Sequence, residues 1–174
     1  MKYRILAATL LATVILFSVA YSQIGFQDVL DTPARISSLA PRTLYNGITM
    51  AGKRLVSVGQ RGHIVYSDDQ GKSWIQAIVP VSSDLTAVAF PTPQQGWAVG
   101  HDATILVSSD AGRTWTRQFQ GEDLQQSFLD VLALDERQAI AVGAYGLYYF
   151  TRDAGQTWTQ RKLRAEDAHF NRIT

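Results

Sequence analysis

The chain has 174 residues, 46% of them apolar, which is enough for one domain with a well-buried core. Sixteen Lys and Arg residues nearly balance fifteen Asp and Glu residues, and the net charge of +1 argues against nucleic acid binding driven by overall charge. The sequence contains no cysteine, which excludes disulfides, thiolate metal sites and a lipid-anchored N-terminal cysteine.

Residues 1–22 have the pattern of a secretory signal peptide. Lys2 and Arg4 form a positive start, residues 5–20 are apolar, and Ala20-Tyr21-Ser22 offers small residues for cleavage. The alternative is an uncleaved membrane anchor, because the apolar stretch is just shorter than a bilayer-spanning helix. We predict cleavage and export, so that the mature domain is periplasmic or secreted.

Residues 23–43 are expected to be a leader that packs on the first repeat. The segment contains Pro33 and Pro41 among several Ser, Thr and Asp residues, and it lacks the polar–apolar alternation typical of strands.

An eight-residue motif then occurs three times. Each copy has the order hydroxyl residue, any residue, Asp, any residue, Gly, any residue, hydroxyl residue, Trp. Its structural positions are Ser67, Asp69, Gly71 and Trp74, then Ser108, Asp110, Gly112 and Trp115, and finally Thr151, Asp153, Gly155 and Trp158. The tryptophans are 41 and 43 residues apart, and a period of this length indicates a repeat architecture.

The motif has the chemistry of a tight turn rather than of a reaction centre. Its Asp can accept backbone N–H groups, its Gly permits a positive φ, and its hydroxyls add side-chain to backbone bonds. Burying roughly 150–250 Å² of Trp at about 25 cal/mol per Å² gives about 4–6 kcal/mol as an upper bound. We therefore expect the three motif tryptophans to pin each hairpin to a neighbour, and Trp97, outside the motif, to pack between repeats.

Each period contains four short segments typical of β-strands. In the first period these are a segment with Tyr45 and Ile48 as apolar anchors, then Leu55–Gly59, Ile64–Ser67 and a last segment from Trp74 to Gln76. Four short strands per period with glycine punctuation predict an all-β propeller of four-stranded blades. The predicted blades are residues 44–83, 84–126 and 127–167, and a fourth begins at 168.

Three blades and the start of a fourth do not close a ring, since propellers use roughly 4–8 blades. An open ring exposes strand edges and apolar faces, which favours self-association. We therefore expect this chain to be the N-terminal part of a longer protein. The alternative is that two chains complete one ring.

Several short sequences are similar to catalytic or ligand-binding motifs, but their residue spacing does not match those motifs. Gly71-Lys72-Ser73 is similar to the end of a phosphate-binding loop, but the upstream glycine of that loop is replaced by Tyr66. Asp68 and Asp69 are adjacent, whereas calcium loops alternate their ligands. Three histidines lie in different parts of the repeat, without zinc-ligand spacing: His63, His101 and His169. We expect no metal and no cofactor.

The octet matches the Asp-box repeat, also called the BNR repeat. Together with Val58–Ile64, Arg54–Gly59 and the leader phrase Leu30–Ala34, it resembles the photosystem II stability/assembly factor-like family over residues 26–174. The resemblance implies an exported, seven-bladed, non-enzymatic propeller that binds other proteins. In photosynthetic organisms the family's partner is a photosystem II reaction-centre subunit.

Asp-box propellers also include sialidases and xyloglucan hydrolases, so the fold alone does not decide the activity. A glycosidase needs two converging carboxylates, but the glutamates fall in predicted turns: Glu122, Glu136 and Glu166. The Arg-Ile-Pro element of sialidases is absent, because Arg35-Ile36 is followed by Ser37. A hydrolase with its catalytic residues in further blades is the main alternative, and a surface adhesion or carbohydrate-binding module is a third.

The candidates for partner binding are positions where the repeat varies. The turn between the second and third strands opens on the face opposite the octets, and the connections between blades share that face. These segments carry Arg61, His101, Asp102, Tyr145, Arg117 and Arg161, with Lys162 and Arg164 further on. Arg and Tyr are enriched at interface hot spots. The alternative is that these are ordinary solvated loop residues.

Overall fold

The computed structural model describes residues 27–121, 123, 125–161 and 170–174. The predicted signal peptide, residues 1–22, lies outside the described residues. So do the basic residues Lys162 and Arg164 of the blade connection, His169, Glu122 and Glu166. In the described part of the chain no helix is long and apolar enough to cross a bilayer.

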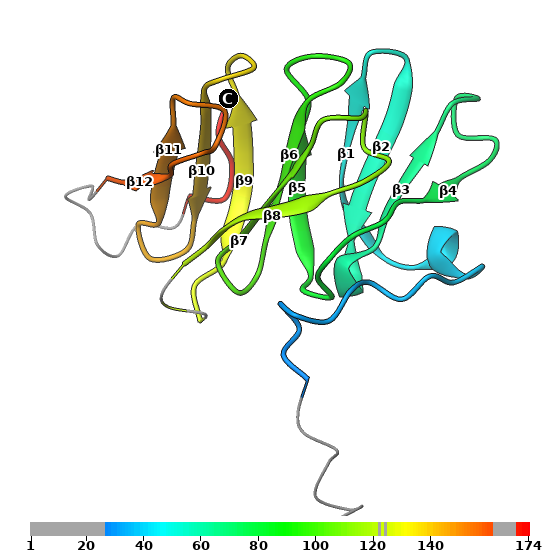
Figure 1. The fold of residues 1–174 in the computed structure, drawn as a ribbon, viewed down its shortest axis with the longest axis horizontal. Coiled ribbons are helices and arrows are strands. Elements are labelled where there is room, and N and C mark those ends of the chain that lie inside the picture. Colours follow the sequence, from blue (N-terminus) through cyan, green and yellow to red (C-terminus); the bar gives the residue numbers. More distant parts are fainter. Residues whose placement is uncertain (1–26, 122, 124, 162–169) are drawn as a thin grey trace, which may run out of the picture.

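Three antiparallel four-stranded sheets stand side by side in an open arc (Figure 1). The first consists of β1 (Tyr45–Ala51), β2 (Arg54–Gly59), β3 (Ile64–Ser67) and β4 (Ile75–Gln76). The second consists of β5 (Leu85–Ala89), β6 (Gly96–Gly100), β7 (Thr104–Ser108) and β8 (Thr116–Gln120). The third consists of β9 (Phe128–Ala133), β10 (Ala139–Gly143), β11 (Tyr148–Thr151) and β12 (Thr159–Gln160). Two single-turn 3-10 helices, η1 (Ala40–Arg42) and η2 (Gln60–Gly62), complete the described elements.

This arrangement confirms the prediction of an all-β propeller with four-stranded blades in a partial ring. Each sheet follows chain order from its first strand to its fourth, as expected when every strand is joined to the next by a short hairpin.

A bulge recurs at the start of each first strand. The pairing register shifts between Tyr45 and Gly47 in β1 and between Leu85 and Ala87 in β5. It also shifts in β9, opposite Val142 and Gly143. A bulge turns one side chain out of the strand's alternation. In the first sheet Asn46 Nδ2 donates to the Leu85 carbonyl of the second sheet (2.8 Å). The repeated bulge therefore joins neighbouring sheets near their innermost strands.

Two apolar clusters lie between the sheets. The first joins the first and second sheets and contains Val56, Val58, Ile64, Leu85, Leu106 and Trp115. The second joins the second and third sheets and contains Trp97, Val99, Ile105, Phe128, Ala141 and Leu147. Trp97 has no exposed surface, which confirms that it packs between repeats.

The outward face of the first sheet has no neighbouring sheet in the described part of the chain. Ile48 and Met50 alternate along β1 with Gly47, which lies against Ala87 of the second sheet, so they point away from that sheet. Their side chains are 61% and 49% exposed. On the third sheet the opposite outward face contains Ile140, Tyr148 and Phe150, which line a shallow pocket of about 110 Å³. Self-association through these faces stays a prediction.

The described C-terminal residues lie against the third sheet without forming a strand. The Phe170 N–H donates to the Gly143 carbonyl (3.1 Å), and the Ile173 N–H donates to Asp130 Oδ2 (2.8 Å). A fourth blade beginning at residue 168 stays a prediction.

We predict that Trp115→Ala lowers the free energy of unfolding by about 3–5 kcal/mol. The indole is 3% exposed, donates its Nε1–H to the Gly112 carbonyl and meets the Phe90 ring edge-on. Chemical denaturation measures the loss.

The matched control is Trp74→Ala, because Trp74 occupies the same motif position in the first sheet but is only partly buried. A smaller loss is expected for this variant. Equal losses for the two variants would contradict the assignment of Trp115 as an inter-sheet anchor.

Candidate functional site

Each Asp box forms the same closed network of hydrogen bonds. In the first copy Ser67 Oγ donates to Asp69 Oδ1 (2.8 Å) and accepts the Gly71 N–H (2.8 Å). The Asp69 carboxylate also accepts the N–H of Ser73 (2.8 Å) and its hydroxyl (2.6 Å). The copies at Asp110 and Asp153 repeat these contacts. The carboxylates are thus occupied by their own turns.

These hydrogen bonds stabilise the ionised carboxylates. The hydroxyl and N–H of Ser73 lower the pKa of Asp69 to about 2, and those of Thr157 lower the pKa of Asp153 to about 2. A carboxyl group that stays ionised and fully hydrogen-bonded is a poor general acid. This geometry fits the structural role expected for the Asp boxes, which stays a prediction.

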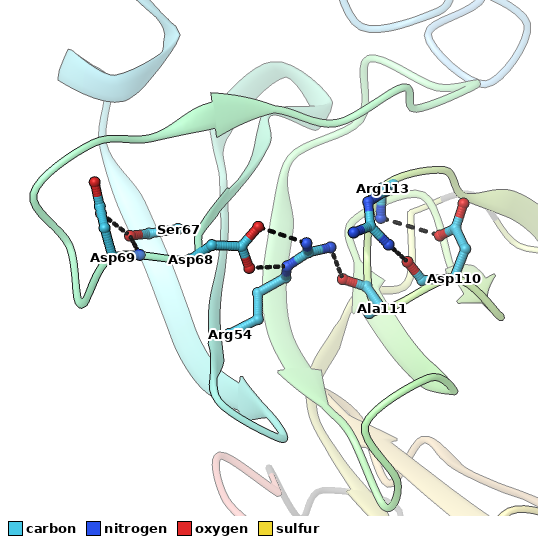
Figure 2. Close-up of polar contacts among 7 residues, drawn as sticks. All are labelled: Arg54, Ser67, Asp68, Asp69, Asp110, Ala111 and Arg113. Carbon is cyan, nitrogen blue, oxygen red and sulfur yellow. Dashed lines mark hydrogen bonds and ion pairs between the residues drawn. The ribbon is translucent and has the colours of Figure 1, made fainter.

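The apex of the second Asp box is seated on the first sheet. Arg54, at the start of β2, donates Nε–H and Nη2–H to the two oxygens of Asp68 (2.7 and 2.6 Å) and Nη1–H to the Ala111 carbonyl (3.1 Å), as Figure 2 shows. Its guanidinium also lies 4.3 Å from the centroid of the Tyr66 ring. Arg54 is only 7% exposed, and the Asp68 partner raises its pKa. One side chain thus connects the first two Asp boxes.

Gln118 makes the corresponding contact between the second and third sheets. Gln118 of β8 donates Nε2–H to the Ala154 carbonyl at the apex of the third box (2.7 Å). Its Oε1 accepts the indole N–H of Trp97 (3.0 Å). Sequence reasoning missed both Arg54 and Gln118, because neither belongs to the motif that each one contacts.

The turns on the opposite edge share one backbone geometry. In each turn the second residue after the strand-ending glycine has a positive φ, which is 56° at Arg61, 56° at Asp102 and 55° at Tyr145. Positive φ is uncommon for such residues. In Figure 1 the hairpins β1–β2, β5–β6 and β9–β10 lie along the top. The β2–β3, β6–β7 and β10–β11 turns lie at the other end of the strands, on the lower side from which the leader enters. Three equivalent turns therefore hold three different side chains at one edge of the arc, which we call the turn edge.

The predicted partner-binding residues differ in how far they are available. Arg61 and Tyr145 are exposed, and Arg161 is exposed after β12. Asp102 Oδ2 accepts the hydroxyl of Ser83, and the His101 ring shares a hydrogen bond with Ser127 (2.9 Å). These two side chains are thus held by the connections between sheets. Their role in binding stays a prediction.

Arg117 is exposed and also contacts the leader, and its role in partner binding stays a prediction. It donates Nη1–H to the Leu30 carbonyl (2.6 Å) and pairs with Asp31 at 3.3 Å. Leu30 and Ala34 are buried in the first apolar cluster, and the Ala34 N–H donates to the Val79 carbonyl (3.0 Å). The leader therefore contacts both the first and the second sheet.

His63 lies between the leader and the first sheet. Its Nδ1 is 3.3 Å from Thr43 Oγ1, and the residue is 6% exposed. Burial lowers the pKa of the imidazole, and the charge of Arg61 adds to this effect. In residues 27–161, apart from 122 and 124, and in residues 170–174, no three His, Asp or Glu side chains are grouped closely enough to hold a metal ion.

Comparison with known proteins shows the same repeat in other chains. Residues 69–167 match a family model described as "Photosynthesis system II assembly factor YCF48". The photosystem II assembly lipoprotein Ycf48 of Picosynechococcus sp. is 29% identical over 101 residues, which cover 54% of this chain and 30% of that protein. The chain thus spans about a third of the length of the curated relatives that it matches.

Two solved structures share the fold. One is described as YCF48 bound to D1 peptide, with a TM-score of 0.60 and 22% identity over 67% of this chain and 39% of that one. The other is an ancestral GH74 enzyme, with a TM-score of 0.58 and 16% identity over 75% of this chain and 22% of that one. At these identities the likeness concerns the fold alone.

We predict that acid weakens the fold through the Asp boxes. Because the native pKa of Asp153 is about 2 rather than 3.8, its contribution is complete above about pH 4 and is lost as the pH falls toward 2. Asp153→Asn should be less stable near neutral pH and should lose less stability between pH 4 and 2. Thermal unfolding across this range tests it, and parallel curves for the two proteins would contradict it.

A second pH effect is expected at His63. Since its folded pKa lies below the ordinary value of 6.5, the unfolded chain binds the proton more tightly, and stability falls as the pH drops below about 6.5. His63→Gln should reduce the fall in melting temperature between about pH 7 and pH 5. An unchanged fall in this variant would assign the effect to other groups.

Proposed function

The chain belongs to the photosystem II assembly factor YCF48 family, and we propose that it is an exported, non-enzymatic scaffold that binds a protein partner through its turn edge. The partner class that we propose is a subunit of a membrane complex. The related YCF48 structure bound to a D1 peptide supports this choice.

The main observation behind the proposal is that three equivalent turns have the same φ but present different side chains. The φ angles of Arg61, Asp102 and Tyr145 are nearly equal, yet the three side chains are a cation, an anion and an aromatic ring. Rigid elements that present varied side chains are suited to recognising one extended surface.

Export is supported by the predicted signal peptide and by the relatives that are named lipoproteins. We therefore propose that it acts in the periplasm or as a secreted protein.

The alternative is a glycoside hydrolase of the Asp-box class. The ancestral GH74 enzyme supports only the fold. The motif carboxylates are held by hydroxyl and N–H groups of their own turns, which argues against their use as a catalytic pair. Glu136 is exposed in the β9–β10 turn, on the edge opposite the turn edge.

We predict that Arg61→Glu combined with Arg161→Glu weakens partner capture at least about tenfold, because reversed charges oppose a partner selected for the original ones. The measurement is recovery of a stoichiometric protein with tagged chain from the envelope fraction. Thermal stability should stay close to that of the parent, since exposed substitutions usually change it by less than about 0.5 kcal/mol.

The matched control is Lys53→Glu combined with Arg137→Glu, which makes the same charge change at exposed positions on the opposite edge. It should leave capture unchanged. Arg117→Glu is a separate variant, because loss of its bonds to Leu30 and Asp31 is expected to loosen the leader. Equal capture by the Arg61/Arg161 variant and the parent would refute the proposed edge.

A further inference from the structure

A groove of about 800 Å³ runs between the leader and the first sheet. Leader residues between Val29 and Thr43 line it together with Arg61, His63 and Ser82. Its volume falls within the range of ligand sites in proteins, roughly 300–1,000 Å³. Because Arg61 is a tip residue of the β2–β3 turn, the groove opens onto the turn edge.

The leader is fixed on the protein on both sides of this groove. The Ser82 N–H donates to the Val29 carbonyl (2.8 Å). Further along, the Ser37 N–H donates to Gln76 Oε1 (2.9 Å), and Gln76 Nε2 donates to the Arg35 carbonyl (3.0 Å). The groove is therefore a preformed feature with two walls, so a ligand does not have to order it.

Apolar side chains and unpaired cations face this space together. Ile36 and Leu39 are 65% and 61% exposed. Among the described residues, the guanidinium groups of Arg35 and Arg61 make neither a hydrogen bond nor an ion pair. No Asp or Glu lines the groove. A ligand with both a carboxylate and an apolar group matches this lining.

The backbone at Ile36 favours a peptide over a small acid. Within the described part of the chain, neither its N–H nor its carbonyl makes a hydrogen bond. An extended peptide can pair with such an exposed backbone segment while its side chains alternate between the walls.

We propose that this groove binds an extended segment of the partner in which an acidic residue adjoins an apolar one. The carboxylate lies between Arg35 and Arg61, and the apolar side chain packs on Ile36 and Leu39. This inference rests on the proposed function, and it assigns the first contact of the partner to the leader rather than to the sheets alone.

The probe is a fluorescein-labelled nine-residue peptide with three Ser-Leu-Glu repeats, and the matched peptides carry Gln or Lys in place of Glu. Fluorescence anisotropy with the full chain should show at least tenfold tighter binding of the Glu peptide than of the Lys peptide. The difference should shrink at high salt, because exposed charges are screened.

The variants Arg35→Gln and Ile36→Ser should each weaken binding of the Glu peptide at least about fivefold, a change of about 1 kcal/mol. Arg35→Lys keeps the charge and should retain most of the binding. The control is Arg137→Gln, which removes an exposed guanidinium from the opposite edge and should bind like the parent. Unfolding midpoints for all variants distinguish a lost contact from a detached leader.

Failure of any of three comparisons overturns the inference: absence of peptide binding, equal binding of the Glu and Lys peptides, or equal binding by Arg35→Gln and the parent. Capture of the cellular partner separates this result from the proposed function. If Arg35→Gln captures the partner normally and the Arg61/Arg161 variant does not, the turn edge stands and the groove fails. If the peptide binds but no partner is captured, the groove stands and the proposed function fails.

Discussion

The structure depends on the apices of the second and third Asp boxes resting against the preceding sheet. Arg54 makes this contact with the Ala111 carbonyl, and Gln118 makes it with the Ala154 carbonyl. In both cases a side chain donates to a backbone oxygen, so the contact tolerates a change of residue at the apex. The box supplies the shape of the turn, and the neighbouring sheet supplies the donor. Burial of Trp97 and Trp115 between the sheets then stabilises the arc.

The two edges of the arc therefore differ in how their side chains are used. Asp boxes occupy one edge, where their hydroxyl and carboxylate groups hydrogen-bond within their own turns. On the other edge the β2–β3, β6–β7 and β10–β11 turns share a positive φ at Arg61, Asp102 and Tyr145, while their side chains differ. The leader adds to this second edge, and its Arg35 lines the same groove as Arg61. Membership of the YCF48 family and the proposed peptide binding are consistent with this division.

The strands, the Asp boxes and the family were predictable from sequence, because each depends on residues within one repeat. The joining contacts were not. Arg54 and Ala111 are 57 positions apart and Arg117 and Leu30 are 87 apart, and no local pattern encodes such pairs. The contact between Arg117 and the leader was not predicted for the same reason, since Leu30 and Asp31 lie in a segment without strand periodicity. The bulge that brings Asn46 to Leu85 could not be predicted from the alternation of polar and apolar residues either.

The leader reaches the sheets from the side of the turn edge (Figure 1). The described part of the leader thus belongs to the turn edge and also to the first apolar cluster, where Leu30 and Ala34 are buried. A substitution that loosens the leader would therefore change the packing between the first two sheets and the shape of the turn edge together.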